Sequence, residues 1–376
     1  MAKCKLCGKK GLFLRLDNDG LCDTCSGKQK ADALSSYKAL AAAYSRIKPF
    51  REFIDSSNIE GMKECIDACQ EFERLMQNTE ITPSISRLIK LNAITRYSNC
   101  ELPNFDTETK YGDKLEDITK TLDDLLHTAT VRKNLLIGAH DKTVHFVETL
   151  NSLPVVEISV SETAAKKRSV AEVNDIPFST ITKKTPRDKL GNFVVIDTET
   201  TGLNASQSEI IEISAIRFRD YKPVEAFTTL CAPKKGISAE AARINGITAE
   251  MVAGKPTFDK VASALLDFIG ADNLVGHNLE FDLKFIVKHG VDLTASKRKY
   301  YDTLAIAQKT LKKLKEKWDR EYDCYMPDYS ADYDVEDYKL GTLCRYYGIQ
   351  LSGAHRALAD CYATGLLLEC LAKDRE

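Results

Sequence analysis

The chain has 376 residues, more than the roughly 100–200 of one ordinary domain, which predicts two or three domains. Hydrophobic residues make up 43% and charged residues 29%, a globular composition that excludes fibrous and disordered classes. The 53 Lys and Arg residues nearly balance 55 Asp and Glu residues, giving a formal net charge of −2. Composition alone therefore argues mildly against a nucleic-acid partner held by bulk positive charge.

The sequence shows no export signal, so its cysteines need an explanation other than the disulfides of a secreted protein. No apolar run approaches the roughly 20 residues of a membrane span, and the first ten residues, MAKCKLCGKK, lack the apolar core of a secretory signal. We therefore expect no membrane partner and a cytoplasmic location, where disulfides rarely persist. Eight scattered cysteines are predicted to be mostly small buried hydrophobic residues: Cys65, Cys69, Cys100, Cys231, Cys324, Cys344, Cys361 and Cys370.

The other four cysteines form two C-x₂-C pairs separated by fourteen residues: Cys4, Cys7, Cys22 and Cys25. This spacing is typical of a closed Cys₄ zinc site, so residues 1–28 are predicted to form a small ribbon that one structural Zn²⁺ stabilises. A redox CxxC pair is the alternative. Residues 1–50 carry ten Lys and Arg but only four Asp and Glu. This positive charge could guide a nucleic-acid strand, or it could be the solvated surface of a protein-docking module.

Residues 31–153 have apolar side chains at helical spacings of three and four, for example Ile59, Met62 and Ile66. They predict an all-α segment, a bundle or hairpin-like stalk, that could dock a protein partner. The next stretch, 154–190, is polar and lacks helical periodicity, so it is predicted to be a linker.

The pattern from 191 to 376 is α/β. Short apolar or alternating runs predict strands near 193–197, 210–218, 226–231 and 274–277. Helices are predicted near 239–243, 258–269, 281–289, 303–317, 340–347 and 357–371. The segment 321–338 holds seven acids and five tyrosines; it is predicted to be a solvated insertion, with screening of a substrate cleft as the alternative.

Acidic residues in this region lie at the ends of the predicted elements. Asp197 and Glu199 are two apart at the end of a strand, so alternation directs both carboxylates to one side. Asp282 begins a helix that follows a strand, and Asp360 lies inside an otherwise apolar helix, five residues after His355. Taken singly, each has an ordinary structural explanation, such as a turn residue or a helix cap. Together they offer four carboxylates and one imidazole.

This set of residue types suits metal-assisted phosphodiester hydrolysis. Carboxylate oxygens are the ligands that Mg²⁺ and Mn²⁺ prefer, and two such ions can clamp the attacking and leaving oxygens of a phosphodiester. A histidine can accept the proton of the attacking water. The spacing by itself does not name the substrate.

The region from about 192 to 371 resembles the DEDDh 3′–5′ exonuclease family, typified by the proofreading epsilon subunit of bacterial DNA polymerase III. The motifs are FVVIDTETTGL, ISAEAARINGITAEMV, VGHNLEFD, YDTL and AHRALADC, in the family's order. The resemblance implies a ribonuclease H-like mixed sheet flanked by helices. It implies two Mg²⁺ or Mn²⁺ bound by Asp197, Glu199, Asp282 and Asp360, with His355 as general base.

The resemblance also implies contacts with the terminal nucleotide and a reaction. The matching positions are Thr200, Thr201, Gly202, Leu203, His277, Asn278 and Phe281, whose alternative roles are turn chemistry and core packing; Asp302 matches a supporting position. The implied activity is release of nucleoside monophosphates from 3′ ends of DNA, preferably single-stranded. RNA trimming is one alternative, and a non-catalytic adaptor is another.

Overall fold

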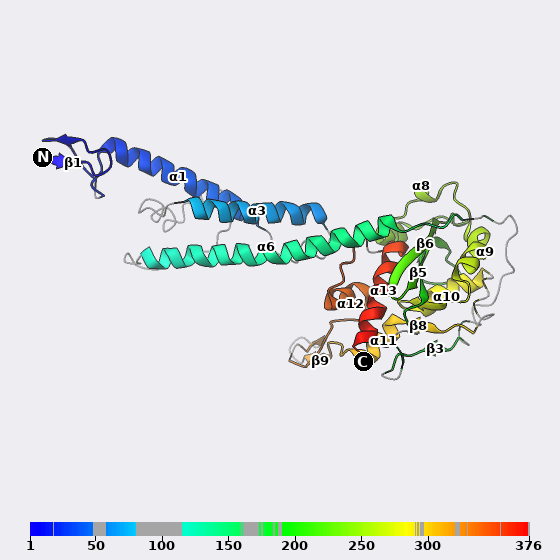
Figure 1. Ribbon diagram of the computed structural model, residues 1–376. Coiled ribbons are helices and arrows are strands. Elements are labelled where there is room, and N and C mark those ends of the chain that lie inside the picture. The colour runs from blue at the N-terminus through cyan, green and yellow to red at the C-terminus, as the bar shows by residue number, and fades with distance from the viewer. Residues whose placement is uncertain are drawn as a thin grey trace. The chain divides into compact units, whose positions relative to one another are not determined.

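The computed structural model describes residues 1–17, 19–47, 58–79, 115–158, 160, 173, 176–182, 185–186, 190–289, 291, 293, 297–319, 324–328, 330–353 and 355–374. The chain divides into two compact units, Met1–Asp141 and Lys142–Glu376 (Figure 1). The α/β class with a small Cys-rich end, expected from the sequence, is confirmed.

The first unit joins a small two-stranded ribbon to long helices. Strands β1 (Ala2–Lys3) and β2 (Lys10–Gly11) pair antiparallel, and helix α1 (Asp23–Ser45) follows directly. Helix α3 (Ile59–Asn78) and the first part of α6 (Leu115–Ser152) complete the unit. The boundary predicted at residue 28 is wrong, because α1 begins between the two cysteines of the second pair and continues past residue 28 to Ser45. The part of the predicted helical segment at residues 80–114 lies outside the described residues.

The helical periodicity predicted for this unit is confirmed in α3. Its apolar face buries Met62, Cys65, Cys69 and Phe72 against the other helices, because positions three and four apart lie on one helix face. The docking role predicted for residues 31–153 stays a prediction. Helix α6 exposes Leu135, of which 50% is accessible.

The last turns of α6 belong to the second unit rather than to the helical segment. Phe146 and Leu153 are buried in the second unit's core, and the Phe146 ring lies 4.7 Å from that of Tyr362. The predicted linker is also partly built into this unit. Val156 N–H donates to Ala226 O at 2.8 Å, so the domain edge predicted at residue 191 comes too late.

The second unit is built on one six-stranded mixed sheet in the order β3-β8-β7-β4-β5-β6. The strands are β3 (Phe178–Ser179), β4 (Phe193–Thr200), β5 (Ile210–Arg219), β6 (Lys222–Leu230), β7 (Asn273–Gly276) and β8 (Tyr300–Asp302). Strands β3, β8, β7 and β4 are parallel neighbours, whereas β5 pairs antiparallel with both β4 and β6. The central strand, β4, therefore has one parallel and one antiparallel partner.

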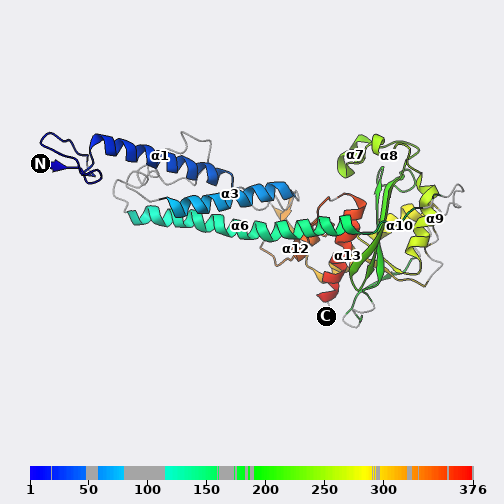
Figure 2. The same ribbon diagram turned by 45° about the horizontal axis from the view of Figure 1, so that its top comes forward.

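Helices cover both faces of this sheet (Figure 2). One face carries α11 (Thr303–Thr310), α12 (Leu340–Tyr347) and α13 (Ala357–Lys373), and the other carries α9 (Phe258–Ile269) and α10 (Leu279–Lys288). Phe193 and Val195 of β4 pack on the α13 side, whereas Val194 and Ile196 pack on the α9 and α10 side. Alternation then directs the next odd-numbered residues of β4 toward α13.

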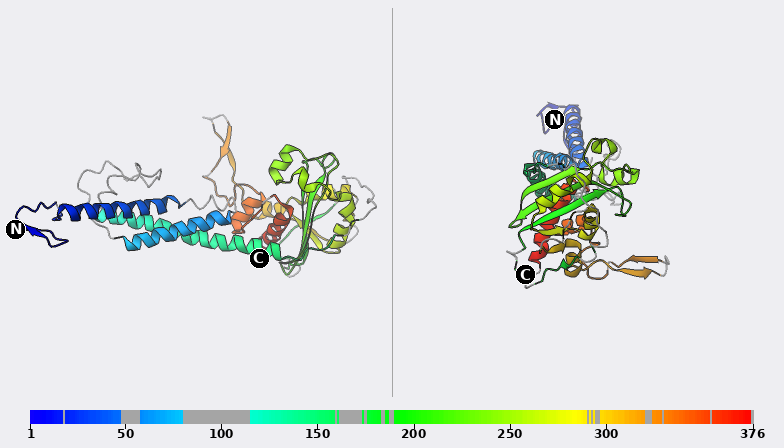
Figure 3. Two further views of the ribbon diagram at one scale, coloured as in Figure 1. Left: turned by 90° about the horizontal axis from the view of Figure 1, so that it is seen from above. Right: turned by 90° about the vertical axis from the view of Figure 1, so that its right-hand side faces the viewer.

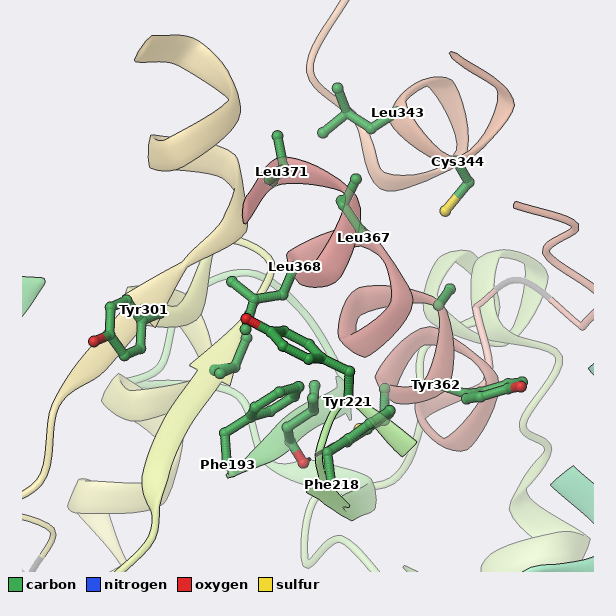
Figure 4. Packing of buried hydrophobic residues seen from close by; sticks show 14 of the residues in the cluster. Phe193, Phe218, Tyr221, Tyr301, Leu343, Cys344, Tyr362, Leu367, Leu368 and Leu371 are labelled. Atoms are coloured by element: carbon green, nitrogen blue, oxygen red, sulfur yellow. Dashed lines mark hydrogen bonds between the residues drawn. The ribbon is translucent and has the colours of Figure 1, made fainter. Parts of the chain in front are cut away.

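Small residues let α13 lie very close to the sheet (Figure 4). The Sγ of Cys361 lies 3.3 Å from Ser214 O, and a Cβ on Gly365 would overlap the ring of Phe218. The Phe218 ring in turn stacks on Phe193, with centroids 4.8 Å apart. A larger residue at position 365 would separate helix from sheet.

The remaining elements lie at the edges of the second unit. Helices α7 (Ala239–Asn245) and α8 (Ala249–Val252) follow β6, and strands β9 (Glu316–Asp319) and β10 (Cys324–Pro327) form a projecting hairpin (Figure 3). The helix predicted to reach residue 317 is wrong, because α11 ends at Thr310. The segment after it is rich in lysine, and apart from Leu311 and Leu314 its side chains up to residue 317 are exposed. Strand β10 is wholly exposed, as predicted for a solvated insertion, but Val335 of the same predicted segment is only 3% exposed and packs in the second unit's core.

Within the described ranges, every helix is too short or too polar to serve as a membrane span. Five of the scattered cysteines are buried, as predicted: Cys65, Cys69, Cys231, Cys344 and Cys361. Cys324 is exposed and Cys370 is half-buried, while Cys100 lies outside the described residues.

Candidate active site

Three acids meet where β4 ends beneath the start of α13. Asp197 and Glu199 come from β4 and Asp360 from the first turn of α13, with one carboxylate oxygen of each within 4.8 Å of the others. The two β4 acids face α13 because they continue the alternation of Phe193 and Val195. The predicted convergence of Asp197 and Glu199 on one point is therefore present in the structure.

The fourth predicted acid, Asp282, comes from the opposite helical layer. It lies in the first turn of α10 and is only 3% exposed. Its Oδ1 accepts hydrogen bonds from the N–H of Thr198 at 2.9 Å and from the Thr198 hydroxyl at 2.6 Å. Thr198 lies between the two β4 acids, and alternation along the strand directs its side chain to the opposite face of the sheet, toward α10.

Burial and mutual repulsion raise the pKa of each of these acids. Burial raises the pKa of Glu199 to about 8 and that of Asp360 to about 7, and neighbouring acids add to both shifts. Burial also raises the pKa of Asp282 to about 7, and the Thr198 hydrogen bonds oppose this. The pKa of Asp197 is raised by burial first and then by the charge of Asp282. The site is therefore unfavourable for four ionised carboxylates on their own.

A divalent cation fits this donor set. Among the described residues, Oδ1 of Asp360 is buried and receives no hydrogen bond, although buried oxygens normally have a partner. Three convergent carboxylates are the ligand type that Mg²⁺ and Mn²⁺ prefer. A cation between them would provide that missing partner and would favour the ionised carboxylates.

A fifth acid, which sequence reasoning missed, adjoins the site. Glu212 lies on β5 directly opposite Glu199 and is 3% exposed. Arg356 holds it with two guanidinium nitrogens, Nε at 3.0 Å from Oε2 and an Nη at 2.8 Å from Oε1. The N–H of Ala357, at the start of α13, donates to Oε2 at 3.1 Å. Glu212 thus fastens the segment that carries His355 and Asp360.

The predicted general base lies at the mouth of this site. His355 is exposed, its backbone has a left-handed φ of 63°, and its N–H donates to Oδ2 of Asp360 at 3.2 Å. His355 and Asp360 line one cavity of about 770 Å³. The walls also include His277, Asn278, Lys339 and Arg345.

His277 and Asn278 therefore line the same cavity as Asp360, as predicted, but the His277 ring and the Asn278 backbone N–H have structural partners. Nε2 of His277 donates to Tyr338 O at 3.0 Å, and Nδ1 lies 2.9 Å from the hydroxyl of Thr303. Burial lowers the pKa of His277 to about 4, so its ring is neutral. The N–H of Asn278 donates to Asp302 at 2.9 Å.

Asp302 has the supporting position that its motif suggests. Its Oδ1 also accepts the N–H of Leu304 at 2.9 Å and so caps α11. Burial raises its pKa, opposed by these backbone hydrogen bonds. Asp302 therefore organises the loops around the cavity.

The turn after β4 is stabilised by its own polar groups. The Thr200 hydroxyl donates to Gly202 O at 2.8 Å, and Thr201 exchanges hydrogen bonds with Glu209 at 2.9 and 3.0 Å. Leu203 extends from this turn with 87% of its surface exposed. Phe281, by contrast, packs against Phe285 in the core, with ring centroids 5.1 Å apart.

The four N-terminal cysteines converge as their spacing predicts. Their Sγ atoms all lie within 4.8 Å of one another, with those of Cys7 and Cys22 3.8 Å apart. Sulfurs on a tetrahedron with Zn–S bonds of about 2.3 Å are separated by about 3.8 Å. The N–H of Cys22 donates to Sγ of Cys4 at 3.3 Å, and backbone hydrogen bonds from Cys22 and then Cys7 lower the pKa of Cys4 to about 6.

The sheet and its acidic site define a nuclease. Residues 194–368 match the family model RNase_T, described as exonuclease. The chain is 33% identical over 182 residues to the DNA polymerase III subunit epsilon of Aquifex aeolicus, covering 47% of this chain and 80% of that subunit. It is also 33% identical over 178 residues to the PolC-type DNA polymerase III of Clostridium perfringens.

The chain belongs to the exonuclease family, and the enzyme class predicted from the motifs is confirmed. The alignment with the Clostridium PolC-type polymerase covers 47% of this chain but only 11% of that polymerase. A solved structure of exonuclease X in complex with 5′ overhanging duplex DNA is 27% identical to this chain, with a TM-score of 0.35. The alignment covers 48% of this chain and 91% of the exonuclease X chain.

Proposed function

We propose that this protein is a 3′–5′ exonuclease that removes nucleoside monophosphates from DNA ends, preferably single-stranded, with two Mg²⁺ or Mn²⁺ ions. The observation that carries the proposal is the convergence of Asp197, Glu199 and Asp360 around the unpartnered Oδ1 of Asp360. The preference for DNA over RNA draws on the names of the DNA polymerase relatives.

The metal ions would be held by the three convergent acids and by Asp282. Bound there, they would neutralise charge at the phosphodiester and orient its oxygens. Asp282 lies outside the group of three carboxylates whose oxygens converge within 4.8 Å, and its role rests on its second oxygen, because Thr198 occupies only Oδ1. Glu212 stays out of the ligand set, because Arg356 neutralises it.

The chain's own residues would position the strand and move the proton. His355 is exposed at the cavity and directly precedes the segment fastened by Glu212, so its imidazole can take the proton of the attacking water. Leu203 projects from the turn after β4 and would pack against the last base. Lys339 and Arg345 of the cavity wall would contact backbone phosphates.

The test is a timed digestion of 3′- and 5′-labelled oligonucleotides with and without Mg²⁺, on matched DNA and RNA. The double variant Asp197→Ala/Glu199→Ala should lose metal-dependent hydrolysis, whereas Asp267→Ala, at an exposed acid of α9, should retain it. Full activity of the double variant would overturn the assignment. Faster digestion of RNA than of DNA would show that RNA is the substrate. If the unmodified protein released no nucleotide from either strand, the non-catalytic adaptor would be the remaining interpretation.

For the N-terminal cysteines we propose one structural Zn²⁺ bound by Cys4, Cys7, Cys22 and Cys25, in a cytoplasmic protein whose thiols stay reduced. The 3.8 Å sulfur separation and the N–H to sulfur hydrogen bond support zinc over a redox pair. Cys22→Ser should abolish stoichiometric zinc binding, measured by elemental analysis, while leaving digestion of short oligonucleotides unchanged. The exposed Cys324→Ser serves as the matched control. A full zinc complement in Cys22→Ser would refute the site.

A further inference from the structure

The N-terminal ribbon exposes a group of apolar side chains that the active site does not use. Phe13 is 98% exposed, Leu12 81% and Leu6 63%. A single exposed apolar residue needs no explanation, but three on so small a unit indicate a binding surface. Leu12 and Phe13 directly follow β2, so the ordered strand pair presents them in a defined position.

The same segment is strongly basic. Residues 1–17 contain five cationic side chains, all exposed: Lys3, Lys5, Lys9, Lys10 and Arg15. The single acid in this range is Asp17, whose Oδ1 accepts the N–H groups of Asp19 at 3.0 Å and Leu21 at 2.9 Å. That carboxylate closes the loop before Cys22. The four thiolates and one Zn²⁺ proposed above carry a net charge of −2, so attraction for a polyanion comes from these five exposed cations rather than from the net charge of the ribbon.

The strand register places two of these cations face to face. Lys3 of β1 lies directly opposite Lys10 of β2 in the antiparallel pair. Like charges at such directly opposed positions destabilise a strand pair, and this sheet has only two strands. An anion that contacts both ammonium groups would remove the repulsion. A backbone phosphate has the required charge.

We propose that the ribbon binds single-stranded nucleic acid through the exposed side chains of Leu6, Leu12, Phe13, Lys3 and Lys10. Phe13 stacks on a base, while Lys3 and Lys10 contact a phosphate. The combination of an exposed aromatic ring with a basic surface characterises sequence-tolerant binding of single strands. An acidic peptide would offer the same charge but no base to stack on Phe13. This inference rests on the zinc site proposed above and does not depend on hydrolysis.

The experiment measures binding by the full chain carrying Asp197→Ala/Glu199→Ala, so that the strand stays intact. Fluorescence anisotropy of a labelled oligo-dT is followed over a range of salt concentrations. Phe13→Ala should weaken binding about 5- to 100-fold. Lys3→Ala/Lys10→Ala should weaken it and reduce the salt slope by about 0.7 for each phosphate that the ribbon no longer neutralises.

Matched controls separate these ribbon side chains from the general surface. Leu135→Ala, at an exposed apolar position of α6, and Lys63→Ala, at an exposed lysine of α3, should leave affinity and salt slope unchanged. All variants must retain the zinc content of the parent, which excludes an unfolded ribbon as the cause.

Unchanged binding by both ribbon variants would overturn the proposal. So would loss of affinity for an acidic peptide, such as oligo-glutamate, with no loss for oligo-dT. The nuclease assignment is tested by a different measurement, the digestion of oligonucleotides by the unmodified protein. Binding by the inactive variant can therefore fail or succeed independently of that assignment.

Discussion

The ion pair between Glu212 and Arg356 allows a quantitative prediction about the site. Two changes test it, Arg356→Met and Glu212→Gln, each of which removes one charge and keeps a side chain of similar length. The consequences differ because the partners differ in exposure. Glu212 is only 4% exposed at its side chain, whereas the side chain of Arg356 is 45% exposed.

Arg356→Met leaves a buried carboxylate without its cation, close to Glu199 and Asp360. Removing one partner of a buried pair costs about 3–5 kcal/mol for this reason. Glu212→Gln leaves a guanidinium that water can reach, and the amide oxygen can still accept the N–H of Ala357. We expect it to cost only about 1–2 kcal/mol, the loss of a charge-assisted hydrogen bond at a partly exposed site. The double variant should resemble Glu212→Gln, so the coupling energy should be close to the whole cost of Arg356→Met, about 3–5 kcal/mol.

Urea denaturation measures these differences. Near-UV circular dichroism is the readout, because most of the buried aromatic rings belong to the second unit's core, for example Phe193, Phe218 and Phe227. Both variants should also raise the Mg²⁺ concentration needed for half-maximal digestion, because the segment carrying Asp360 is less firmly held. The reasoning would be refuted if Glu212→Gln proved as costly as Arg356→Met. It would also be refuted if the effects of the two changes simply added.

Without divalent cations, the second unit should become less stable as the pH rises from about 4 to about 8. Over this range the folded protein retains protons that the unfolded chain releases, because burial raises the pKa values of three site acids: Glu199, Asp282 and Asp360. Neutral His277, with a pKa of about 4, opposes the trend below about pH 6.5. Thermal melts followed by near-UV circular dichroism should give a higher Tm at pH 5 than at pH 8, with Mg²⁺ raising the value at pH 8; a lower Tm at pH 5 would contradict this. Gly365→Ala should cost about 1–3 kcal/mol in urea denaturation, because its Cβ overlaps the Phe218 ring. Gly341→Ala, in α12 of the same unit and with open space around it, should be neutral or slightly stabilising, and equal effects would refute the packing argument.

Strong periodicity predicted individual elements well. The helices expected at 258–269 and 340–347 match α9 and α12 residue for residue, because their apolar positions repeat at helical spacing. Prediction failed where burial depended on distant partners. Ile181 is 2% exposed within the predicted linker, and no local pattern indicates that this stretch packs against the sheet.

The same division holds for the active site. The motifs identified the acids and the histidine, but they did not reveal Glu212 and its guanidinium partner. A signal was present, since Glu212 is a charged residue inside the apolar run IIEIS, and a buried charge requires a partner. Arg356 is 144 residues away, so only the fold identifies it.

The sequence by itself determined what depends on neighbouring residues. Strand alternation aligned Asp197 with Glu199, and the two C-x₂-C pairs predicted the four sulfur atoms that converge. The tertiary structure decided which distant groups converge. Small residues let α13 approach β4 and β5 closely enough to bring Asp360 to the β4 acids, while Thr198 engages Asp282 from the other layer. The physical reason is that alternation follows from local backbone geometry, whereas convergence depends on how closely packed side chains allow separate elements to approach.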